Sequence, residues 1–301
     1  MKSVRRFLKR LVGVEALIGY KARLDWRSGI MSKKRAQEVI VSLTAIPSRF
    51  HKLHLVIETI LSQTVKPDRV VLWLSHVDRH GNRIIDDVNQ LPDILQRQIK
   101  RGLEIRFCED LRSYRKLIPA LQAFTNEVLV TADDDTLYPK FWLEKLYYAH
   151  LVNPQDVICY RGSRISFDSN GHLLPYLQWP EFIERDTPSF ALFPTGGEGA
   201  LYPQGVFNET VMDKDVFMDI CLTADDVWFK AMSLYNGIKS RKITEKHQDF
   251  ARIDGTQAKD DTLHFINNVM GQNDVQIKAV FERYNLVSKL KFLEGFYNER
   301  K

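Results

Sequence analysis

The chain has 301 residues, enough to bury one large core or two smaller ones, and its composition (44% hydrophobic, 27% charged) is globular. Its net charge of +5 is uneven, because residues 1–35 hold eleven Lys or Arg and two acidic residues, and the other 266 residues are net −4. This distribution excludes a globally basic nucleic-acid-binding protein and indicates a basic arm on a mildly acidic body. No apolar run reaches the length of a membrane span.

The basic arm, assigned to residues 1–36, begins with an amphipathic helical pattern. Its basic residues lie largely outside the apolar face, which favours a helix that lies on an anionic inner leaflet through residues 2–24. Packing of the helix on the body, or on a partner, explains the pattern equally well. The segment lacks the long apolar core and cleavage site of a signal peptide. The apolar face consists of Val4, Phe7, Leu8, Leu11, Val12 and Ile18, with Glu15 among them.

The three cysteines, Cys108, Cys159 and Cys221, are odd in number, and two of them lie in apolar stretches. This usage favours reduced thiols over a disulfide framework. We therefore expect a cytoplasmic protein, peripheral on the inner face of the cytoplasmic membrane if the basic arm binds lipid.

Predicted strands and helices alternate from residue 37 to 150. The strands are short apolar or β-branched runs, and the helices have apolar residues at helical spacing. This alternation predicts an α/β fold with a Rossmann-type, mostly parallel sheet flanked by helices. The predicted strands are 38–46, 69–75, 103–108 and 127–132, and the predicted helices are 51–62, 91–100, 113–124 and 141–151.

Residues 151–250 have a less regular pattern. A proline-rich and aromatic stretch at 174–203 predicts an ordered but irregular binding surface. The tail, residues 251–301, predicts one or two helices around Gly271. The other predicted elements are a hairpin of strands 157–160 and 164–167, a helix at 223–235 and a strand at 238–243.

A buried strand ends in three consecutive carboxylates, Asp133, Asp134 and Asp135. Open α/β sheets bind ligands at the carboxyl ends of their strands. Three adjacent carboxylates repel one another, which raises their pKa unless a cation neutralises them. Hard oxygen ligands suit Mg²⁺ or Mn²⁺, with phosphate oxygens completing the coordination. A solvated turn is the alternative, although turn chemistry favours Gly or Asn over a third Asp.

A second acidic cluster, Thr223-Ala224-Asp225-Asp226, precedes an apolar helix. One interpretation is a capping box, with Thr223 as the N-cap and Asp226 three residues later. The other makes one aspartate a general base, because a helix N-terminus favours the carboxylate form that a base needs. Both roles can coexist if one residue caps the helix and the other faces substrate.

These features resemble the GT-A-fold glycosyltransferases, in particular bacterial family-2-like enzymes of surface polysaccharide (capsule or lipopolysaccharide) synthesis. The resemblance spans about residues 38–245 and implies a GT-A domain at 37–250, with a nucleotide-binding half at 37–150 and an acceptor half at 151–250. It implies a metal-dependent, inverting, hexosyltransferase-like enzyme that transfers a sugar from a nucleotide-sugar donor to a glycan or lipid-linked acceptor. The motifs are IVSLTAIPSRF, DLRSYRKLIPAL, VLVTADDDTLYPKFW, GGEGALYP and LTADDVWFKAM.

The resemblance also implies roles for individual residues, with Asp225 or Asp226 as the base. Many family members have an acidic pair that contacts base and ribose where this chain has Leu74-Ser75-His76, so the nucleotide is not predicted. The expected metal ligands are Asp133, Asp135 and His247; the expected nucleotide-sugar contacts are Thr44, Pro47, Arg49, Asp110, Lys116, Asp133 and Asp134; the expected acceptor contacts are Gly196, Gly197, Glu198 and Tyr202.

Two other classes remain as alternatives. A haloacid-dehalogenase-type phosphatase also uses aspartates at a strand end, but Leu137 breaks its DxDx[TV] pattern and the strand is about the fourth of the domain. A non-catalytic, membrane-associated sugar-nucleotide-binding protein would explain the basic arm and the missing acidic pair.

Overall fold

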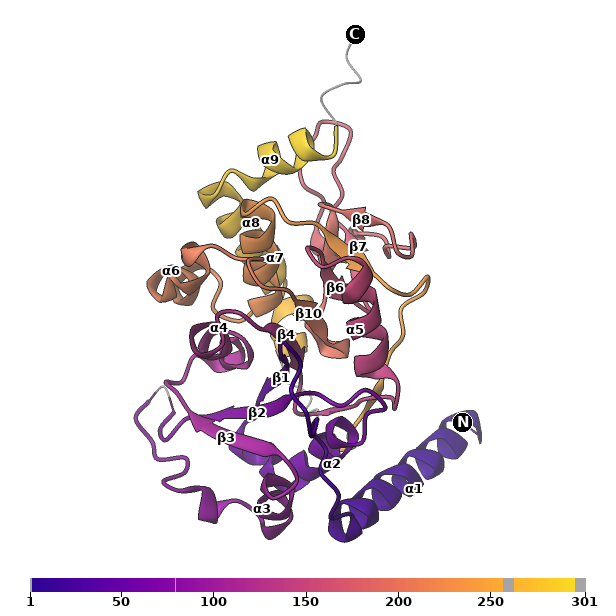
Figure 1. Ribbon diagram of the computed structural model, residues 1–301. Helices are drawn as coiled ribbons and strands as arrows, with labels where there is room; N and C mark the ends of the chain where they lie inside the picture. Colours follow the sequence, from indigo (N-terminus) through magenta and orange to yellow (C-terminus); the bar gives the residue numbers. More distant parts are fainter. Residues whose placement is uncertain (1, 79, 257–262, 296–301) are drawn as a thin grey trace. The chain divides into compact units, whose positions relative to one another are not determined.

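The structure is a computed structural model that describes residues 2–78, 80–256 and 263–295 (Figure 1). The side chains of residues 2–12 lie outside that description. No helix in the described ranges has the length and apolar character needed to cross a bilayer. The chain forms two compact units: the first comprises Met1–Asp110, Arg115–Lys145 and Asp249–Ala258, and the second comprises Leu111–Tyr114, Leu146–Gln248 and Lys259–Lys301.

Four parallel strands in the order β3-β2-β1-β4 organise the first unit. Most residues of β1, β2 and β4 are buried, because these strands are apolar runs without polar alternation. The predicted α/β fold with a mostly parallel sheet is confirmed. The strands are β1 (Val39–Thr44), β2 (Arg69–Leu74), β3 (Leu103–Phe107) and β4 (Val128–Ala132).

The connecting helices of the first unit lie on two faces of this sheet. The connections from β1 to β2 and from β2 to β3 run in one direction, whereas β4 returns to the other side of β1. Right-handed crossovers therefore place α2 and α3 on one face and α4 on the other (Figure 1). The strand order reverses between β1 and β4, where open α/β sheets bind ligands. The helices are α2 (Phe50–Leu61), α3 (Asp93–Ile99) and α4 (Ile118–Ala123), and a short 3₁₀ turn, η2 (Val88–Gln90), precedes α3.

The predicted helix at 113–124 is divided in two. A 3₁₀ turn, η3 (Arg112–Lys116), comes first, and α4 starts with a proline in its first turn. Proline is tolerated there because that position needs no helical N–H, but it interrupts a helix that would continue through it.

Two further features of the first unit bear on function. Helix α1 (Lys2–Leu24) packs against α2 and α3, while the predicted apolar face from Val4 to Val12 lies outside the described side chains. The short strand β5 (Thr136–Leu137), which directly follows the three aspartates, pairs antiparallel with β12 (Ala251–Arg252). This pairing brings a late segment of the chain to the end of β4.

The second unit has two small sheets. In the larger, β6 is parallel to β11 and antiparallel to β10, and β11 is antiparallel to β8. The predicted hairpin of 157–160 with 164–167 is wrong, because β7 leaves this sheet and pairs with β9. At Gly162 a Cβ would lie 2.6 Å from the Phe193 carbonyl oxygen, so the close pairing needs glycine. The strands are β6 (Val157–Cys159), β7 (Gly162–Arg164), β8 (Pro188–Ser189), β9 (Leu192–Pro194), β10 (Ala200–Tyr202) and β11 (Ser240–Lys242).

The predicted tail helices around Gly271 are confirmed, and both pack on α7. A π-helical turn, η7 (Phe265–Val269), precedes them. The described part of the tail resumes at residue 263. The helices are α5 (Trp142–Val152), α6 (Lys214–Ile220), α7 (Asp225–Tyr235), α8 (Gln272–Arg283) and α9 (Leu286–Leu293), and the 3₁₀ turns are η4 (Tyr176–Gln178), η5 (Gly196–Glu198) and η6 (Glu209–Met212).

Candidate functional site

The three aspartates lie at the switch point of the first unit's sheet. They follow β4 directly, and β4 pairs with β1 up to Leu43 and Ala132. The turn after β1 therefore runs beside them, and the backbone N–H of Ile46 donates to Asp134 Oδ2 at 3.2 Å. In η1 (Pro47–Arg49), which follows, the proline fixes the first residue of the turn. The sheet register thus brings two segments 85 residues apart into one site.

Asp133 pairs with a lysine held by the core. Lys116 Nζ lies 3.0 Å from Asp133 Oδ1. The hydroxyl of Ser42 on β1 donates to the Lys116 carbonyl oxygen at 2.6 Å, and Trp73 Nε1 donates to that hydroxyl at 3.0 Å. The backbone of Lys116 is therefore fixed from inside the sheet, and its ammonium group points at the strand end.

Two arginines engage the other carboxylates. Arg49 bonds to Asp134 and lies 3.2 Å from Asp135 Oδ2, and it also donates to the Thr256 carbonyl at 3.0 Å. Arg252, on β12, lies 3.2 Å from Asp135 Oδ1 and donates to the Thr136 hydroxyl. Three basic side chains of the protein thus neutralise the three aspartates. From the sequence alone, we expected a bound metal ion to provide this neutralisation.

The pKa values follow this arrangement. Burial acts to raise the pKa of Asp133, but Lys116, Arg252 and Arg49 outweigh it and hold the pKa below its usual value. Burial raises the pKa of Asp134 to about 6, because its effect is larger than the opposing effect of Arg49. The pKa values of the neighbouring residues Asp133 and Asp134 are therefore shifted in opposite directions.

The residues can be compared with the needs of a divalent cation. Among the described residues, no group of three or more His, Cys, Asp or Glu side chains is arranged to hold a metal ion. Asp133 and Asp135 still supply the hard oxygen atoms that Mg²⁺ and Mn²⁺ prefer. The donor atoms fit such an ion, provided that Arg49 and Arg252 exchange their carboxylate contacts for others.

The remaining nucleotide-side residues lie along the same edge. Thr44, at the end of β1, donates its hydroxyl to the Trp73 carbonyl at 2.8 Å. Asp110 lies 3.5 Å from Arg115 Nε. His76, directly after Ser75 at the end of β2, stacks on Phe107 with ring centroids 4.0 Å apart. An aromatic pair thus lies at the ends of β2 and β3.

The second acidic cluster is built differently. The N-cap of α7 is Ala224 and has no side-chain hydrogen bond, so the predicted capping box is wrong. The Thr223 hydroxyl instead donates to Asn267 Oδ1 at 2.6 Å. The Gln276 side chain accepts from the N–H groups of Thr223 and Ala224, at 2.8 and 3.1 Å, and Asn267 donates to the Thr223 carbonyl. Amides of the tail therefore fix the chain just before the acidic pair.

The two aspartates of α7 have different surroundings. Asp225 is buried, whereas Asp226 is partly exposed. Asp226 Oδ2 accepts a hydrogen bond of 2.9 Å from the backbone N–H of Gly196. Burial raises the pKa of Tyr176 to about 12, and the charge of Asp226 adds a smaller contribution in the same direction. Asp226 is therefore oriented by the glycine-containing turn.

That turn, η5, contains three of the four predicted acceptor residues, and Tyr202 lies on the strand that follows, β10. Gly196 is its first residue, and Gly199 closes it with a φ of +86°, which favours glycine. Glu198 is buried, with one oxygen 4.0 Å from Arg161. Tyr202 is also buried, and its ring packs against Phe207 and Phe229 in the core of the second unit.

His247, the third predicted metal ligand, belongs to the second unit. Its Nε2 lies 2.9 Å from the Gly162 carbonyl oxygen and 3.8 Å from Glu181. The backbone N–H of His247 donates to the same Glu181 carboxylate. These contacts orient the ring toward a backbone carbonyl.

Sequence reasoning missed one partner of the first acidic cluster, Arg252, and two partners of the segment before the second, Asn267 and Gln276. Arg252 is 117 residues from Asp135, and Gln276 is 53 residues from Thr223. Residues 268–274 lie between the two amides and include Gly271, whose φ of +71° lets the chain turn into α8.

No family model matches the sequence, and no curated protein matches it. Among solved structures, the chain is similar to S. aureus TarS in complex with UDP, with a TM-score of 0.45 and 15% identity over 71% of this chain and 59% of that one. It is similar to the mannosyltransferase PcManGT from Pyrobaculum calidifontis, in complex with GDP-Man and Mn²⁺, with a TM-score of 0.49 and 14% identity over 94% and 78%. A 4-diphosphocytidyl-2C-methyl-D-erythritol synthase has a TM-score of 0.41 and 9% identity over 74% and 96%. The chain thus spans 59% of the TarS chain.

Proposed function

We propose that this protein is a glycosyltransferase that moves a sugar from a nucleotide-sugar donor to a hydroxyl group of a glycan or lipid-linked acceptor. The main support is the cluster of opposite charges at the switch point between β1 and β4. Lys116, Arg49 and Arg252 are already gathered there on carboxylates. Such cations also bind phosphate oxygens, and nucleotides bind at this position in open α/β sheets.

The donor diphosphate is proposed to bind among these three cations. Arginine offers paired N–H groups that match phosphate, and lysine offers a point charge. The same groups would stabilise the negative charge that develops on the leaving diphosphate. The turn at 44–49 and Asp110 are proposed to contact the nucleotide.

A divalent cation, Mn²⁺ or Mg²⁺, is proposed as the cofactor. Asp133 and Asp135 would hold it, and Arg49 and Arg252 would then be released to the phosphates. When bound, the ion neutralises part of the charge of the diphosphate. His247 would join these ligands only after its ring turned away from the Gly162 carbonyl.

Asp226 is proposed as the general base. A base must reach the acceptor hydroxyl, and Asp226 is more exposed than Asp225. Its bond to Gly196 also places it beside η5, the proposed acceptor-binding turn. Asp226 would take the hydroxyl proton while the acceptor oxygen bonds to the anomeric carbon and the bond from that carbon to the diphosphate breaks. A single displacement of this kind inverts the anomeric configuration.

The cellular setting is proposed from the same features. Lipid-linked acceptors of surface polysaccharides lie on the cytoplasmic membrane, where a basic segment at residues 2–24 could hold the enzyme by attraction to anionic lipid. The three cysteines form no disulfide, in keeping with a cytoplasmic protein.

The proposal is tested by incubating the protein with sugar nucleotides and Mn²⁺ and identifying the products. Release of nucleoside diphosphate, lost in Asp226→Asn, is expected, because these conditions allow slow transfer to water. Release of inorganic phosphate would instead support the phosphatase alternative. Tight binding of the sugar nucleotide without any turnover, in the presence of acceptor extracts, would support a non-catalytic binding protein.

A further inference from the structure

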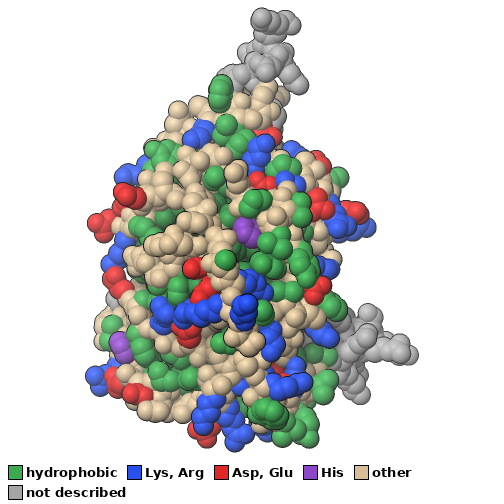
Figure 2. Space-filling model, in the orientation of Figure 1, with side chains coloured by type: hydrophobic (Ala, Val, Ile, Leu, Met, Phe, Trp, Pro, Cys, Tyr) green, Lys and Arg blue, Asp and Glu red, His purple; other side chains and the backbone are tan. Residues whose placement is uncertain are grey.

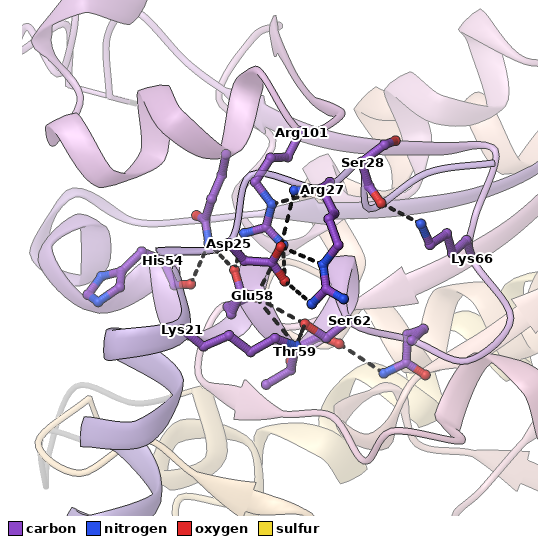
Figure 3. A network of polar contacts seen from close by, with 12 residues as sticks. Lys21, Asp25, Arg27, Ser28, His54, Glu58, Thr59, Ser62, Lys66 and Arg101 are labelled. Carbon is purple, nitrogen blue, oxygen red and sulfur yellow. Dashed lines mark hydrogen bonds and ion pairs between the residues drawn. The ribbon is translucent and has the colours of Figure 1, made fainter. Parts of the chain in front are cut away.

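The C-terminal end of α1 is fixed to the first unit by a buried polar network (Figure 3). Arg101 donates to both oxygens of Glu58, at 2.5 and 3.2 Å, and both side chains are almost fully buried. Arg101 Nε also donates to the Arg27 carbonyl at 3.0 Å. From α1 itself, Lys21 donates to Ser62 at 2.5 Å and lies 3.8 Å from Glu58. The network joins α1 and the segment after it to α2 and the turn after α3.

Close backbone packing reinforces this attachment. A Cβ on Gly29 would lie 2.5 Å from the Leu61 side chain, so the segment after α1 touches the end of α2 directly. A Cβ on Gly19 would lie 3.6 Å from Leu55, and Ala22 is buried. By helical periodicity, Ala22 and Ile18 continue the apolar face that the sequence predicted for lipid. In the described part of α1, that face meets the protein instead.

A different set of apolar side chains points outward. Four of them, spaced by three or four residues, lie along one side of α1, and a fifth lies two residues past the end of the helix. We call them the α1 stripe; it consists of Val14 (42% exposed), Leu17 (68%), Tyr20 (64%), Leu24 (59%) and Trp26 (84%). Single exposed apolar residues are ordinary, but four along one side of a helix and a fifth close to its end form a patch that needs a partner. Figure 2 shows hydrophobic side chains beside basic ones over this end of α1.

The segment that carries the stripe has a strong excess of basic residues. Residues 1–35 hold eleven Lys or Arg and only two acidic residues, Glu15 and Asp25. Glu15 accepts from the backbone N–H of Asp254, and Asp25 bonds to Arg27. Arg23 is exposed beside the stripe, and Arg97 of α3 donates to its carbonyl at 3.2 Å. Both acids are thus engaged within the protein, and among the described side chains of α1 Arg23 is exposed and Lys21 is partly exposed.

From this geometry we propose that the α1 stripe docks the protein on an anionic lipid bilayer, with α1 lying in the headgroup plane. An apolar face with an interfacial tryptophan and flanking arginines is the chemistry that this plane selects. A second copy of the chain is a poorer occupant, because two segments of charge +9 would repel each other. The fixed attachment of α1 means that docking also sets the orientation of the first unit. The proposal is independent of the transferase chemistry, since lipid binding needs no donor.

Trp26 offers a direct measurement. The other four tryptophans, Trp73, Trp142, Trp179 and Trp228, are at most 5% exposed, so a change of emission on contact with lipid reports Trp26. With vesicles of phosphatidylcholine and phosphatidylserine, the full chain should cosediment and its emission should shift to the blue. With phosphatidylcholine alone, both signals should be far weaker.

Variants distinguish binding through the stripe from non-specific hydrophobic binding to vesicles. Leu17→Glu with Leu24→Glu should weaken vesicle binding by roughly tenfold or more, and Arg23→Gln by about fivefold. The matched control is Phe292→Glu on α9, which removes an equally exposed apolar side chain (74%) and should leave binding unchanged. Donor binding without vesicles should be unchanged in all of them, which also shows that they are folded.

Two outcomes would overturn the proposal. In the first, the wild-type protein does not bind the vesicles, or the stripe variants bind them as strongly as the wild type does. The other is a concentration-dependent dimer in sedimentation velocity that Leu17→Glu abolishes, because the stripe would then cover a second copy of the chain. A wild-type protein that binds a sugar nucleotide but no vesicles would refute the docking surface alone and leave the transferase proposal standing.

Discussion

The two units treat their aspartates in opposite ways. In the first unit, Asp133, Asp134 and Asp135 are balanced by cations within about 3 Å. In the second, Asp226 is oriented by the backbone N–H of Gly196, and the chain before it is held by uncharged amides. Balanced charges suit an anionic ligand that takes over the cations. A partly exposed carboxylate in a fixed orientation is suited to take a proton from a hydroxyl group.

The largest effect on turnover is expected from substitution of the proposed general base. Asp226→Asn should lower turnover by about 10²–10⁴-fold, because a positioned general base contributes that much. Donor affinity should stay within a factor of two or so, since the donor cations belong to the other unit. Steady-state kinetics and nucleotide titration measure the two quantities separately.

Asp225→Asn is the matched variant for that experiment. It should reduce turnover less, through a disturbed start of α7. If Asp225→Asn abolishes turnover and Asp226→Asn keeps most of it, the two roles are reversed.

The next effect concerns the balanced charges. Arg252→Ala should weaken the binding of a nucleoside diphosphate by about 10–100-fold, the value of a charge-assisted hydrogen bond, and should leave nucleoside binding unchanged. Arg69→Ala is the control, because Arg69 also forms two ion pairs in the first unit, with Glu38 and Glu104. Equal losses in both variants, or equal losses for nucleoside and diphosphate, would mean that Arg252 only supports the fold.

The second unit also buries a lysine. Lys230, on α7, is 2% exposed, and its Nζ makes no hydrogen bond to any residue that the structure describes. Burial lowers its pKa to about 7, against smaller opposing effects of Glu294 and Cys159. Above pH 7 the unfolded chain, with an ordinary lysine pKa, binds more protons than the folded one. Stability should therefore rise with pH in that range.

Between pH 7 and 8.5 the free energy of unfolding should rise by about 1.5 kcal/mol, as measured by urea denaturation. Lys230→Met should remove this slope and make the protein more stable at pH 7. An equal slope in the two proteins would show that Lys230 is not the group that titrates.

The smallest expected effect concerns the tail amides. Gln276→Leu should lower turnover about tenfold and stability by about 1 kcal/mol, as for a lost helix cap, with donor affinity unchanged. Gln272→Leu, one turn earlier on α8, is the control. Loss of stability without loss of turnover would mean that the tail supports the fold and does not position the acidic pair.

The sequence predicted the parts of the molecule that depend on local patterns. The strands of the first unit follow from apolar runs, and the position of Asp133 at a strand end follows from the strand itself. Arg252 could not be found this way, because its place depends on the pairing of two-residue strands 117 residues apart. The cation balance was missed for the same reason.

The failed capping box shows a related limit. Thr223 and Asp226 have the spacing of a cap, but Gln276 and Asn267 satisfy the groups around Thr223, and Gly196 takes a carboxylate oxygen of Asp226. Side chains and backbone groups from other parts of the chain therefore form the hydrogen bonds that the capping box would have formed locally. Glutamine and asparagine have no spacing rule that would have predicted this.

The central claim is that the strand-end aspartates and their cations form a nucleotide-sugar site. Isothermal titration of UDP-, GDP- and CMP-sugars, with and without Mn²⁺, tests it on the wild type and on Asp135→Ala. We expect one nucleotide to bind in a metal-dependent manner and Asp135→Ala to lose that binding. Binding that is indifferent to metal and to the substitution, or no binding of any sugar nucleotide, would contradict the claim.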